Sequence, residues 1–555
     1  MANLSQIKRE QMIAFLEKLK EQHNDDESLI AFNQIEKELT SKKYGLVWEE
    51  HEEKVDEQIK THIPVFSEVQ EKTIKNSTSD VCNFLLEGDN LHSLKLLEKT
   101  SRGRVDVIYI DPPYNTGNND FVYQDAYVDA NDSYRHSKWL SFMKARLEVA
   151  RRLLARNGLI FISIDDRELY NLKLLMDELF DERNFVTCFS WMKTATASNL
   201  SKTVRNKMEY VLCYKKGELD YVINGGLTDG GDVPLLNTSN KRATVILPKE
   251  AIVFKIHDGL YRAGDYDKVT IEQDLVIKDG KATSDLHITG KFKWSQETIN
   301  QEVASGTYFL VKTEKFSVRF QRPTKSVKTP SNLITKDECS VGTNEEGFSI
   351  LKDIFGEVTF DYSKPVSLIK YLISMNPNAQ LILDFFAGSG TTGQAVLELN
   401  KEDGQERRFI LCTNNENGIC ENVTYERLRT VITGEKANGE KYSDGIATNL
   451  KYYRTGFVDK ASEEISDDLL GHIKEMIELD YGIVIDERRY VLIYDDESMD
   501  DFEKKFDSFV NLKAVFISQD VLLSTSQENI LKKVDTYIIP DCYFDFELRE
   551  VGEIW

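Results

Sequence analysis

The sequence predicts an α/β protein built on an open sheet, and three observations carry this prediction. Apolar runs at 105–110, 158–164 and 381–386 are rich in β-branched or aromatic residues and are typical of buried strands. The last of these runs leads through a glycine-rich turn into a helical pattern at 394–399. A stretch of about 130 residues between the runs, 217–345, alternates turns with short strands, which predicts an inserted domain.

Length and composition agree with a multidomain globular protein. A chain of 555 residues is too long for one core and suggests about three to five units. Apolar residues make up 41% and charged residues 29%, and no run of 18 apolar residues occurs. The polar start at 1–6 does not resemble a signal peptide, and seven cysteines without a C-x-x-C pair fit a reducing compartment. We therefore expect a cytoplasmic protein without a structural zinc ion.

The amino-terminal region, 1–69, is charged and rich in helix-forming residues. Met12, Phe15, Leu16 and Leu19 have the spacing of one apolar helix face. We expect this helical region to pack on the body of the protein or on a partner and to take no part in chemistry.

The strand at 105–110 runs directly into Asp111-Pro112-Pro113-Tyr114, where a carboxylate, two prolines and a ring follow a strand end. Ligands of open α/β sheets bind at the carboxyl ends of strands. The prolines donate no N–H, so neighbouring carbonyls remain free as acceptors. Asp111 and such a carbonyl could hold both hydrogens of an exocyclic amino group, while Tyr114 could stack on a planar base. The alternative is a Pro-Pro turn with a structural aspartate cap.

The strand at 381–386 ends in the glycine-rich turn 387–393, which precedes a helix. A strand, a glycine turn and a helix bring the backbone close to a nucleotide-like ligand. Gly388, Gly390 and Gly393 also satisfy G-x-G-x-x-G, so a nicotinamide dinucleotide site is an alternative. That alternative leaves the Asp-Pro-Pro-Tyr segment without a purpose. A P-loop is disfavoured because no lysine follows the second glycine.

Together the two motifs resemble those of the amino-methyltransferases of DNA. Asp111–Tyr114 is similar to the family's Asp-Pro-Pro-Tyr signature, and Phe386–Thr392 resembles the S-adenosylmethionine loop of its beta class. In that circularly permuted class the Asp-Pro-Pro-Tyr half comes first, as it does here. The resemblance covers about 70–435 and is closest to the modification subunits of type III restriction–modification systems.

This resemblance implies a Rossmann-like, circularly permuted S-adenosylmethionine-dependent methyltransferase sheet, interrupted by a target-recognition domain and followed by a small α/β domain. The expected parts are an N-terminal helical region at 1–69, the catalytic half at 70–216, the target-recognition domain at 217–345, the cofactor half at 346–435 and an acidic C-terminal α/β domain at 436–555.

The resemblance also implies site residues. Lys364 would neutralise the methionine carboxylate, although a solvated lysine is the plain alternative. Glu416 lies beyond the next strand, 408–412, and would accept hydrogen bonds from the ribose hydroxyls, a role that Asn414 or Asn415 could share. The catalytic set would be Asp111, Pro112, Pro113 and Tyr114, and the cofactor set Asp384, Phe386, Gly388, Ser389, Gly390, Thr391, Thr392, Lys364 and Glu416.

Three further residues would lie near the target base. Asp89 falls where the family has an acidic residue close to that base, while its ordinary role before a helical stretch would be an N-cap. Trp191 and Phe121 could line the path of the base, although an aromatic residue at a strand end usually belongs to the core.

The net charge of −23 is unfavourable for a protein that binds a polyanion, but the charge is unevenly distributed. Residues 191–330 contain 22 Lys and Arg against 16 Asp and Glu, whereas 451–555 contain 12 against 25. We therefore expect the middle region to contact DNA and the acidic carboxyl-terminal domain to face a protein partner or a second copy. The expected contact residues are basic side chains among aromatic ones: Lys312, Lys315, Arg319, Arg322, Lys325 and Lys328, with Trp294, Phe316 and Phe320.

The implied reaction is transfer of a methyl group from S-adenosylmethionine to N6 of a flipped adenine in double-stranded DNA, with no metal. The implied partners are a second copy in a homodimer and a helicase-nuclease restriction subunit. Two alternatives remain. One is N4 methylation of cytosine, which is disfavoured because serine more often takes the place of Asp111 in that group. The other is a catalytically silent recognition subunit of a larger complex.

Overall fold

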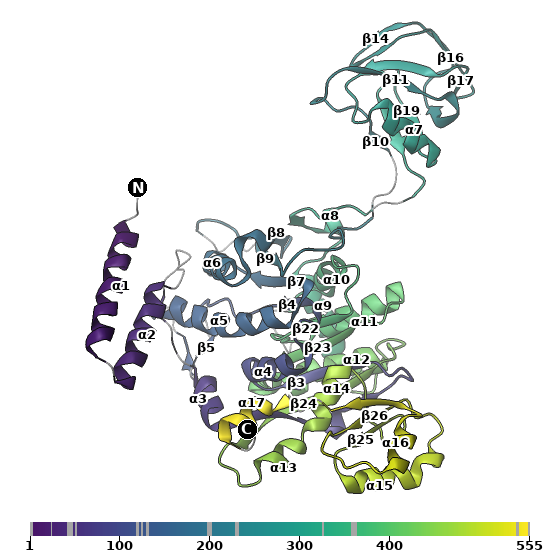
Figure 1. Cartoon of the computed structure of the whole chain (residues 1–555). Coiled ribbons are helices and arrows are strands. Elements are labelled where there is room, and N and C mark those ends of the chain that lie inside the picture. Colours follow the sequence, from purple (N-terminus) through teal and green to yellow (C-terminus); the bar gives the residue numbers. More distant parts are fainter. Residues whose placement is uncertain are drawn as a thin grey trace. The chain divides into compact units, whose positions relative to one another are not determined.

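The structure is a computed structural model of the chain, and it describes residues 4–23, 25–40, 48–49, 51, 53–117, 121–123, 126–128, 132–196, 202–227, 232–324, 327–356, 363–539 and 543–552 (Figure 1). The chain divides into two compact units. The first comprises 1–219, 342–370 and 380–555, and the second comprises 220–341 and 371–379. The second unit closely matches the predicted insert at 217–345, with a short segment added from far along the chain.

The first unit is built on one large mixed sheet. Its centre consists of six parallel strands, and antiparallel strands flank them on both sides. The central order is β24 (Asn449–Asp459), β3 (Cys82–Glu87), β23 (Arg408–Thr413), β22 (Leu381–Asp384), β4 (Val105–Ile110) and β7 (Leu154–Ile164). The flanking strands are β1 (His62–Glu68) beside β24, and β9 (Met208–Lys215) followed by β8 (Phe185–Met192) beside β7.

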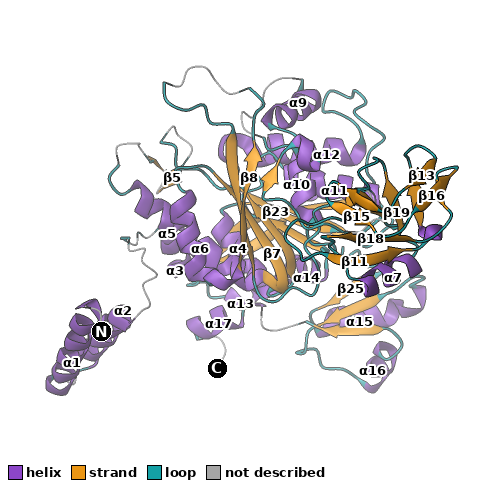
Figure 2. Ribbon diagram, turned by 90° about the horizontal axis from the view of Figure 1, so that it is seen from above, coloured by secondary structure: helices purple, strands orange, loops and turns teal. Residues whose placement is uncertain are grey.

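Helices cover both faces of this sheet, which explains why its central strands are mostly apolar and buried along nearly their whole length. Figure 2 shows α4, α5 and α6 on one side of the sheet and α11 and α12 on the other. Their bounds are α4 (Asn90–Ser101), α5 (Arg135–Leu153), α6 (Leu169–Phe180), α11 (Thr391–Asp403) and α12 (Glu426–Thr433). None of the described helices in the chain combines the length and apolar content of a membrane span.

The two sequence motifs meet because their strands are neighbours. Strand β22 pairs in parallel with β4, with Ile382 opposite Val107 and Leu383 opposite Ile108. Parallel neighbours end at the same edge of a sheet, so Asp111 and the glycine turn emerge side by side. The predicted α/β sheet is therefore confirmed.

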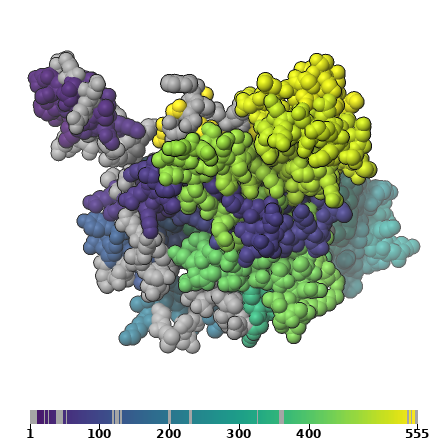
Figure 3. Space-filling view, turned by 90° about the horizontal axis from the view of Figure 1, so that it is seen from below, coloured from purple at the N-terminus to yellow at the C-terminus, as the bar shows by residue number. Residues whose placement is uncertain are grey.

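The sheet extends beyond the predicted boundaries at 69 and 435. Strand β1, from the predicted helical region, pairs with β24, from the predicted carboxyl-terminal domain, and β24 pairs with β3. Figure 3 shows the corresponding surfaces, dark purple and yellow-green, in direct contact. These strands cover an edge of β3 that would otherwise present unpaired backbone groups. The large sheet thus includes strands from outside the range 70–435.

The amino-terminal helices are α1 (Leu4–Gln22) and α2 (Asp26–Thr40), with Lys20 Nζ donating to Asn33 Oδ1 at 2.7 Å. Leu16 is buried, but Met12 and Phe15 are 53% and 61% exposed, so the predicted apolar face is only partly covered in one copy of the chain. Helix α3 (Lys54–Thr61) leads into β1.

The carboxyl-terminal part forms the predicted small α/β layer. Strands β25 (Tyr490–Ile493), β26 (Ala514–Ile517) and β27 (Asp535–Ile538) are parallel, and α15 (Asp496–Lys505) and α16 (Thr525–Leu531) connect them. Residues 483–485 form a loop that follows α14 (Ile473–Tyr481).

The second unit is a small β-rich body with its own core. One sheet has the order β10 (Val233–Pro234), β20 (Val318–Gln321), β19 (Tyr308–Val311), β12 (Ile252–Phe254). Another has the order β11 (Ala243–Leu247), β18 (Leu286–Gly290), β15 (Val269–Ile271), β14 (Gly264–Tyr266). The third joins β13 (Gly259–Tyr261), β16 (Leu275–Lys278) and β17 (Lys281–Ala282), and α7 (Gln296–Ala304) is the unit's longest helix apart from α10 (Val366–Ser374), which belongs to both units.

The basic and aromatic segment of this unit is used differently from the prediction. Phe316 and Phe320 are buried in its core, and Phe320 packs on Trp294 with ring centroids 4.0 Å apart. Lys312 and Arg319 both pair with Asp232 at 2.6 Å. The buried rings of Phe316 and Phe320 therefore offer no stacking surface to a base. Along β20, alternate side chains point to opposite faces, so Phe320 lies in the core while Arg319 lies nearer the surface. Lys325 lies outside the described residues.

Candidate functional site

The Asp-Pro-Pro-Tyr loop leaves β4 and is anchored from α5. Trp139 is fully buried, and its Nε1 donates to the Pro113 carbonyl at 2.7 Å. The Tyr114 hydroxyl donates to Asp111 Oδ1 at 2.8 Å, and burial raises the pKa of Tyr114. The Pro113 carbonyl thus accepts a hydrogen bond that fixes the loop against α5.

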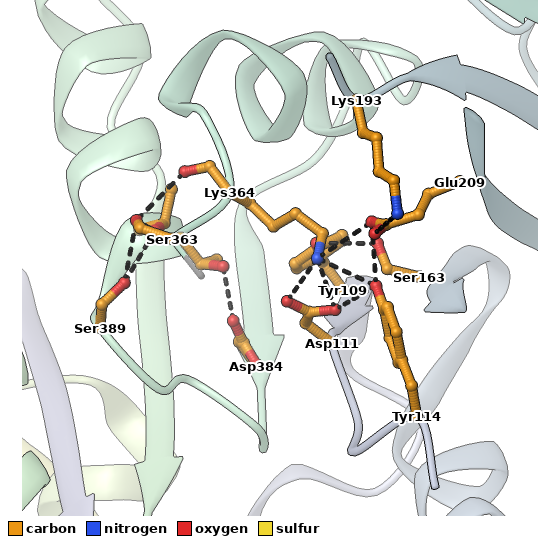
Figure 4. A network of polar contacts seen from close by, with 12 residues as sticks. Tyr109, Asp111, Tyr114, Ser163, Lys193, Glu209, Ser363, Lys364, Asp384 and Ser389 are labelled. Carbon is orange, nitrogen blue, oxygen red and sulfur yellow. Dashed lines mark hydrogen bonds and ion pairs between the residues drawn. The ribbon is translucent and has the colours of Figure 1, made fainter. Parts of the chain in front are cut away.

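Asp111 lies in a buried network of opposite charges (Figure 4). Lys364 Nζ donates to both carboxylate oxygens of Asp111, at 3.0 and 2.9 Å, and lies 3.4 Å from Glu209 Oε2. Lys193 Nζ donates to Glu209 Oε1 at 3.0 Å. Lys364 and Glu209 are each only 7% exposed. Two ammonium groups and two carboxylates thus neutralise one another where the loop leaves the sheet.

The network keeps Glu209 and Lys364 ionised. Burial alone would raise the pKa of Glu209, but the neighbouring Lys364 and Lys193 ammonium groups hold that pKa below its ordinary value. Burial would also lower the pKa of Lys364, and the carboxylates of Asp111 and Glu209 raise it instead. Glu209 and Lys364 thus each stabilise the charged form of the other.

Glu209 and Lys193 were missed by sequence reasoning. Glu209 is the single acid in the otherwise uncharged run 208–214. An acid in such a run is the signal that could have found it, because a buried carboxylate needs a partner. Lys193 follows β8 and carries no such signal.

Asp384 is the last residue of β22, just before the glycine turn, and it is 2% exposed. Its side chain holds the turn by two hydrogen bonds. One of its carboxylate oxygens accepts from the Phe386 N–H at 2.9 Å and the other from the Thr392 hydroxyl at 2.5 Å. Gly390 has φ +78°, and a Cβ there would lie 3.1 Å from Thr424 Cγ2. Free N–H groups at the start of α11 follow directly, which suits a nucleotide-like ligand close to the backbone.

Asp384 provides a pH-dependent stability test. Burial raises its pKa from 3.8 to about 7. A raised acid pKa stabilises the folded state fully below the unfolded pKa, and this contribution is lost as the pH rises towards 7. We expect the stability difference between the wild type and Asp384→Asn, measured by denaturant unfolding, to shift against the wild type between pH 4.5 and pH 8. A difference that is constant over this range would contradict the raised pKa.

A hydroxyl cluster lies beside the turn. Ser363 Oγ is 3.1 Å from Ser389 Oγ and 3.2 Å from Thr391 Oγ1. The guanidinium of Arg427, from α12, donates to Thr391 Oγ1 at 2.8 Å and to Ser389 Oγ at 3.1 Å. Arg427 and Ser363 were also missed by sequence reasoning, because nothing in the motif indicates a contact from α12.

Glu416 lies where the prediction requires it. It opens the short helix η4 (Glu416–Gly418) just beyond β23, the strand beside β22, and it is exposed. Phe386 is half-buried, with its ring centroid 5.8 Å from that of Phe142. The assignment of each to the cofactor stays a prediction.

The three residues predicted near the base have structural contacts. Asp89 caps α4, with its Oδ1 accepting from the Leu91 N–H at 2.7 Å. Phe121 is 2% exposed and packs on Phe142. Trp191 is fully buried and donates to the Gly342 carbonyl at 3.0 Å. In this conformation neither ring has a face open to a base, and all three base contacts stay predictions.

No group of three or more His, Cys, Asp and Glu residues in the described part of the chain is arranged to hold a metal ion.

Comparison with known proteins adds the family. The sequence model described as "DNA methylase" matches residues 105–425, which include both motifs and the insert between them. The type III restriction–modification enzyme StyLTI Mod subunit of Salmonella typhimurium is 32% identical over 67% of this chain and 60% of its own length. The EcoPI Mod subunit of Escherichia phage P1 is 32% identical over 62% and 59%. The type II methyltransferase M.KpnI of Klebsiella pneumoniae is 30% identical over 67% and 88%.

The match thus spans about three fifths of the length of the two Mod subunits. Among solved structures, the PvuII DNA methyltransferase described as cytosine-N4-specific aligns over 64% of this chain and 94% of its own at 14% identity, with a TM-score of 0.32, too low to add to the fold assignment. The family model covers more than half of the chain, and both of its motifs meet at one sheet edge. The chain therefore belongs to the DNA methylase family.

Proposed function

We propose that the chain transfers the methyl group of S-adenosylmethionine to N6 of an adenine flipped out of duplex DNA. The observation that carries this proposal is the meeting of Asp111–Tyr114 with the glycine turn at the ends of the neighbouring strands β4 and β22. An amine pocket and a nucleotide-like pocket at one sheet edge suit transfer between two ligands.

The residues of the turn fit this cofactor. Gly388 and Gly390 have φ values of +48° and +78°, which favour glycine. Because glycine has no side chain, a ligand can approach the backbone of the turn closely, just before α11 begins. When bound, the cofactor supplies a methyl group on a sulfonium, which is already a good leaving group. The residues that would hold it are those of the turn, with Glu416 towards the ribose.

The protein's part in the reaction is electrostatic. A base must leave the stack to be reached, which costs a few kcal/mol. Asp111 and the Pro112 carbonyl would accept the two amino hydrogens, and the Tyr114 ring would stack on the base. The carboxylate stabilises positive charge that develops on the nitrogen, with no covalent intermediate. To accept from the amine, Asp111 must share its oxygens with Lys364, which already donates to both of them.

We also propose a biological setting from the relatives. Two of them are named Mod subunits of type III restriction–modification enzymes. The chain would accordingly be a cytoplasmic modification subunit that recognises its site through the second unit, assembles as a homodimer and joins a restriction subunit. The acidic carboxyl-terminal layer and the exposed Met12 and Phe15 are surfaces available for such protein contacts.

The direct test is incubation of the purified chain with methyl-labelled S-adenosylmethionine and mixed-sequence duplex DNA, followed by digestion and identification of the labelled nucleoside. Label in N6-methyladenine is the expected result. Label in N4-methylcytosine would correct the base and retain the site. Bound cofactor without any label, also after addition of a restriction subunit, would contradict the proposed activity and favour a silent recognition subunit.

The role of Glu416 is tested by binding. We expect Glu416→Ala to raise the dissociation constant of S-adenosylmethionine about 10-fold, because a carboxylate that accepts from hydroxyls contributes roughly 1.5 kcal/mol. Isothermal titration calorimetry measures this dissociation constant. Glu406→Ala is the matched control, because Glu406 is an exposed acid near the opposite end of β23. Equal effects of the two substitutions would remove Glu416 from the site.

A further inference from the structure

Arg427 is a fully buried arginine that forms no ion pair with an acidic residue in the described part of the chain. Its Nε donates to Gln394 Oε1 at 2.8 Å, and its Nη1 donates to the hydroxyls described above and to the Ser389 carbonyl at 3.2 Å. Its Nη2 is buried and has no hydrogen-bond partner. Within the described part of the chain, no carboxylate forms an ion pair with this guanidinium.

Burying a guanidinium without a negative charge beside it destabilises the folded protein, unless a bound ligand supplies that charge. An uncompensated buried cation loses several kcal/mol of hydration. Arg146, the other arginine without any exposure, shows the usual solution, because its Nη1 pairs with Glu53 Oε1 at 2.7 Å. Glu398, a carboxylate whose charge acts on Arg427 from a distance, has other partners: it accepts from Gln394 at 2.9 Å and pairs with Lys370 at 3.4 Å.

The charge is transmitted to the glycine turn through hydroxyls. The oxygens of Ser363, Ser389 and Thr391 lie 2.8–3.3 Å from Nη1 and share its two hydrogens with the Ser389 carbonyl. The three hydroxyls also lie within hydrogen-bond distance of one another, so they form one cluster that the guanidinium polarises. Ser389 lies between Gly388 and Gly390, and Thr391 is the first residue of the 13-residue helix α11. A buried cation, a hydroxyl cluster and a helix amino terminus together favour a small anion beside the turn.

We propose that Arg427, acting through Ser363, Ser389 and Thr391, is the counter-charge for the carboxylate of the methionine part of S-adenosylmethionine. This inference rests on the proposed function and makes it more specific. Lys364, to which sequence reasoning gave this role, already has two carboxylate partners in Asp111 and Glu209. Arg427 is thus a positioning residue for the cofactor, and Lys364 belongs to the amine pocket.

The test compares two ligands that differ only in that carboxylate, S-adenosylmethionine and its decarboxylated form, by isothermal titration calorimetry. We expect Arg427→Gln to weaken binding of S-adenosylmethionine about 10- to 100-fold, the range of a charge-assisted hydrogen-bond pair, and binding of the decarboxylated form less than about twofold. The matched control is Arg407→Gln, a nearby buried arginine that pairs with Asp403, and it should change neither affinity.

Equal weakening of both ligands by Arg427→Gln would overturn the inference and leave Arg427 a structural residue. If that variant does not fold, Ser389→Ala and Ser363→Ala decide, because each removes one hydroxyl from the relay and leaves Arg427 in place. Each should weaken only the carboxylate-bearing ligand, by about threefold to 10-fold. If the wild-type chain binds neither ligand, the proposed function is overturned as well. This outcome differs from equal weakening of both ligands by Arg427→Gln, which overturns only the role of Arg427.

Discussion

Replacement of Asp111 by alanine is expected to lower the rate of methyl transfer by about 10³-fold or more, while the dissociation constant of S-adenosylmethionine changes by less than about threefold. The reason is the position of the carboxylate. It lies at the end of β4, where it would meet the amino group, whereas the cofactor turn belongs to β22. Single-turnover transfer of labelled methyl groups and calorimetric binding measure the two quantities separately.

Asp111→Asn separates charge from shape. It keeps one oxygen acceptor at the same place but removes the negative charge, so we expect most of the rate to be lost here as well. Asp501→Ala is the control, because Asp501 is a surface acid that pairs with Lys504 far along the chain. Transfer at more than about a tenth of the wild-type rate in Asp111→Ala would remove Asp111 from the reaction.

Replacement of Lys364 by methionine is expected to destabilise the first unit by about 3 kcal/mol and to reduce methyl transfer as well. The ammonium compensates two carboxylates, of which Glu209 is 7% exposed, and its loss leaves like charges facing each other. We use the lower end of the usual range for a broken buried pair, because the Asp111 side chain is 25% exposed. Denaturant unfolding followed by tryptophan fluorescence measures the effect.

A double variant identifies the cause. Adding Glu209→Gln to Lys364→Met removes the buried acid that lost one of its two lysine partners, and about half of the stability should return. Lys370→Met is the matched control, since Lys370 pairs with Glu398 and Glu402 near the surface and should cost less than about 1 kcal/mol. A Lys364→Met variant as stable as the wild type, or one that Glu209→Gln weakens further, would show that the network is not held together by these charges.

Local sequence was sufficient for the core of the site. The strands at 105–110 and 381–384 are apolar except for Asp106 and Asp384, because both of their faces are buried, and such runs are visible without a structure. The residues after each strand are of types that solve one local problem, such as Gly390 at φ +78° or Pro113 where no N–H is needed. The chemistry of both motifs could therefore be predicted from short segments.

The position of other residues was not indicated by the local sequence. Asp89 is a helix cap, and Phe121 and Trp191 are buried, while their contacts with the base stay predictions. Phe316 and Phe320 alternate with basic residues in the sequence, but both rings are buried, and alternation along β20 places Phe320 inside and Arg319 towards the surface. The boundaries at 69 and 435 missed β1 and β24, because an edge strand looks the same in sequence whether it joins a near or a distant sheet.

The sequence by itself determined the α/β class, the order of the two motifs and the residues that each motif contributes. Only the tertiary structure decided which side chains from elsewhere complete them: Glu209 and Lys193 around Asp111, and Arg427 beneath the glycine turn. The physical reason is that motif residues are selected by the local backbone conformation, which a short segment of sequence reveals. A buried charge is stable only beside a partner that the folded chain brings within a few ångströms, and that partner can lie anywhere in the sequence.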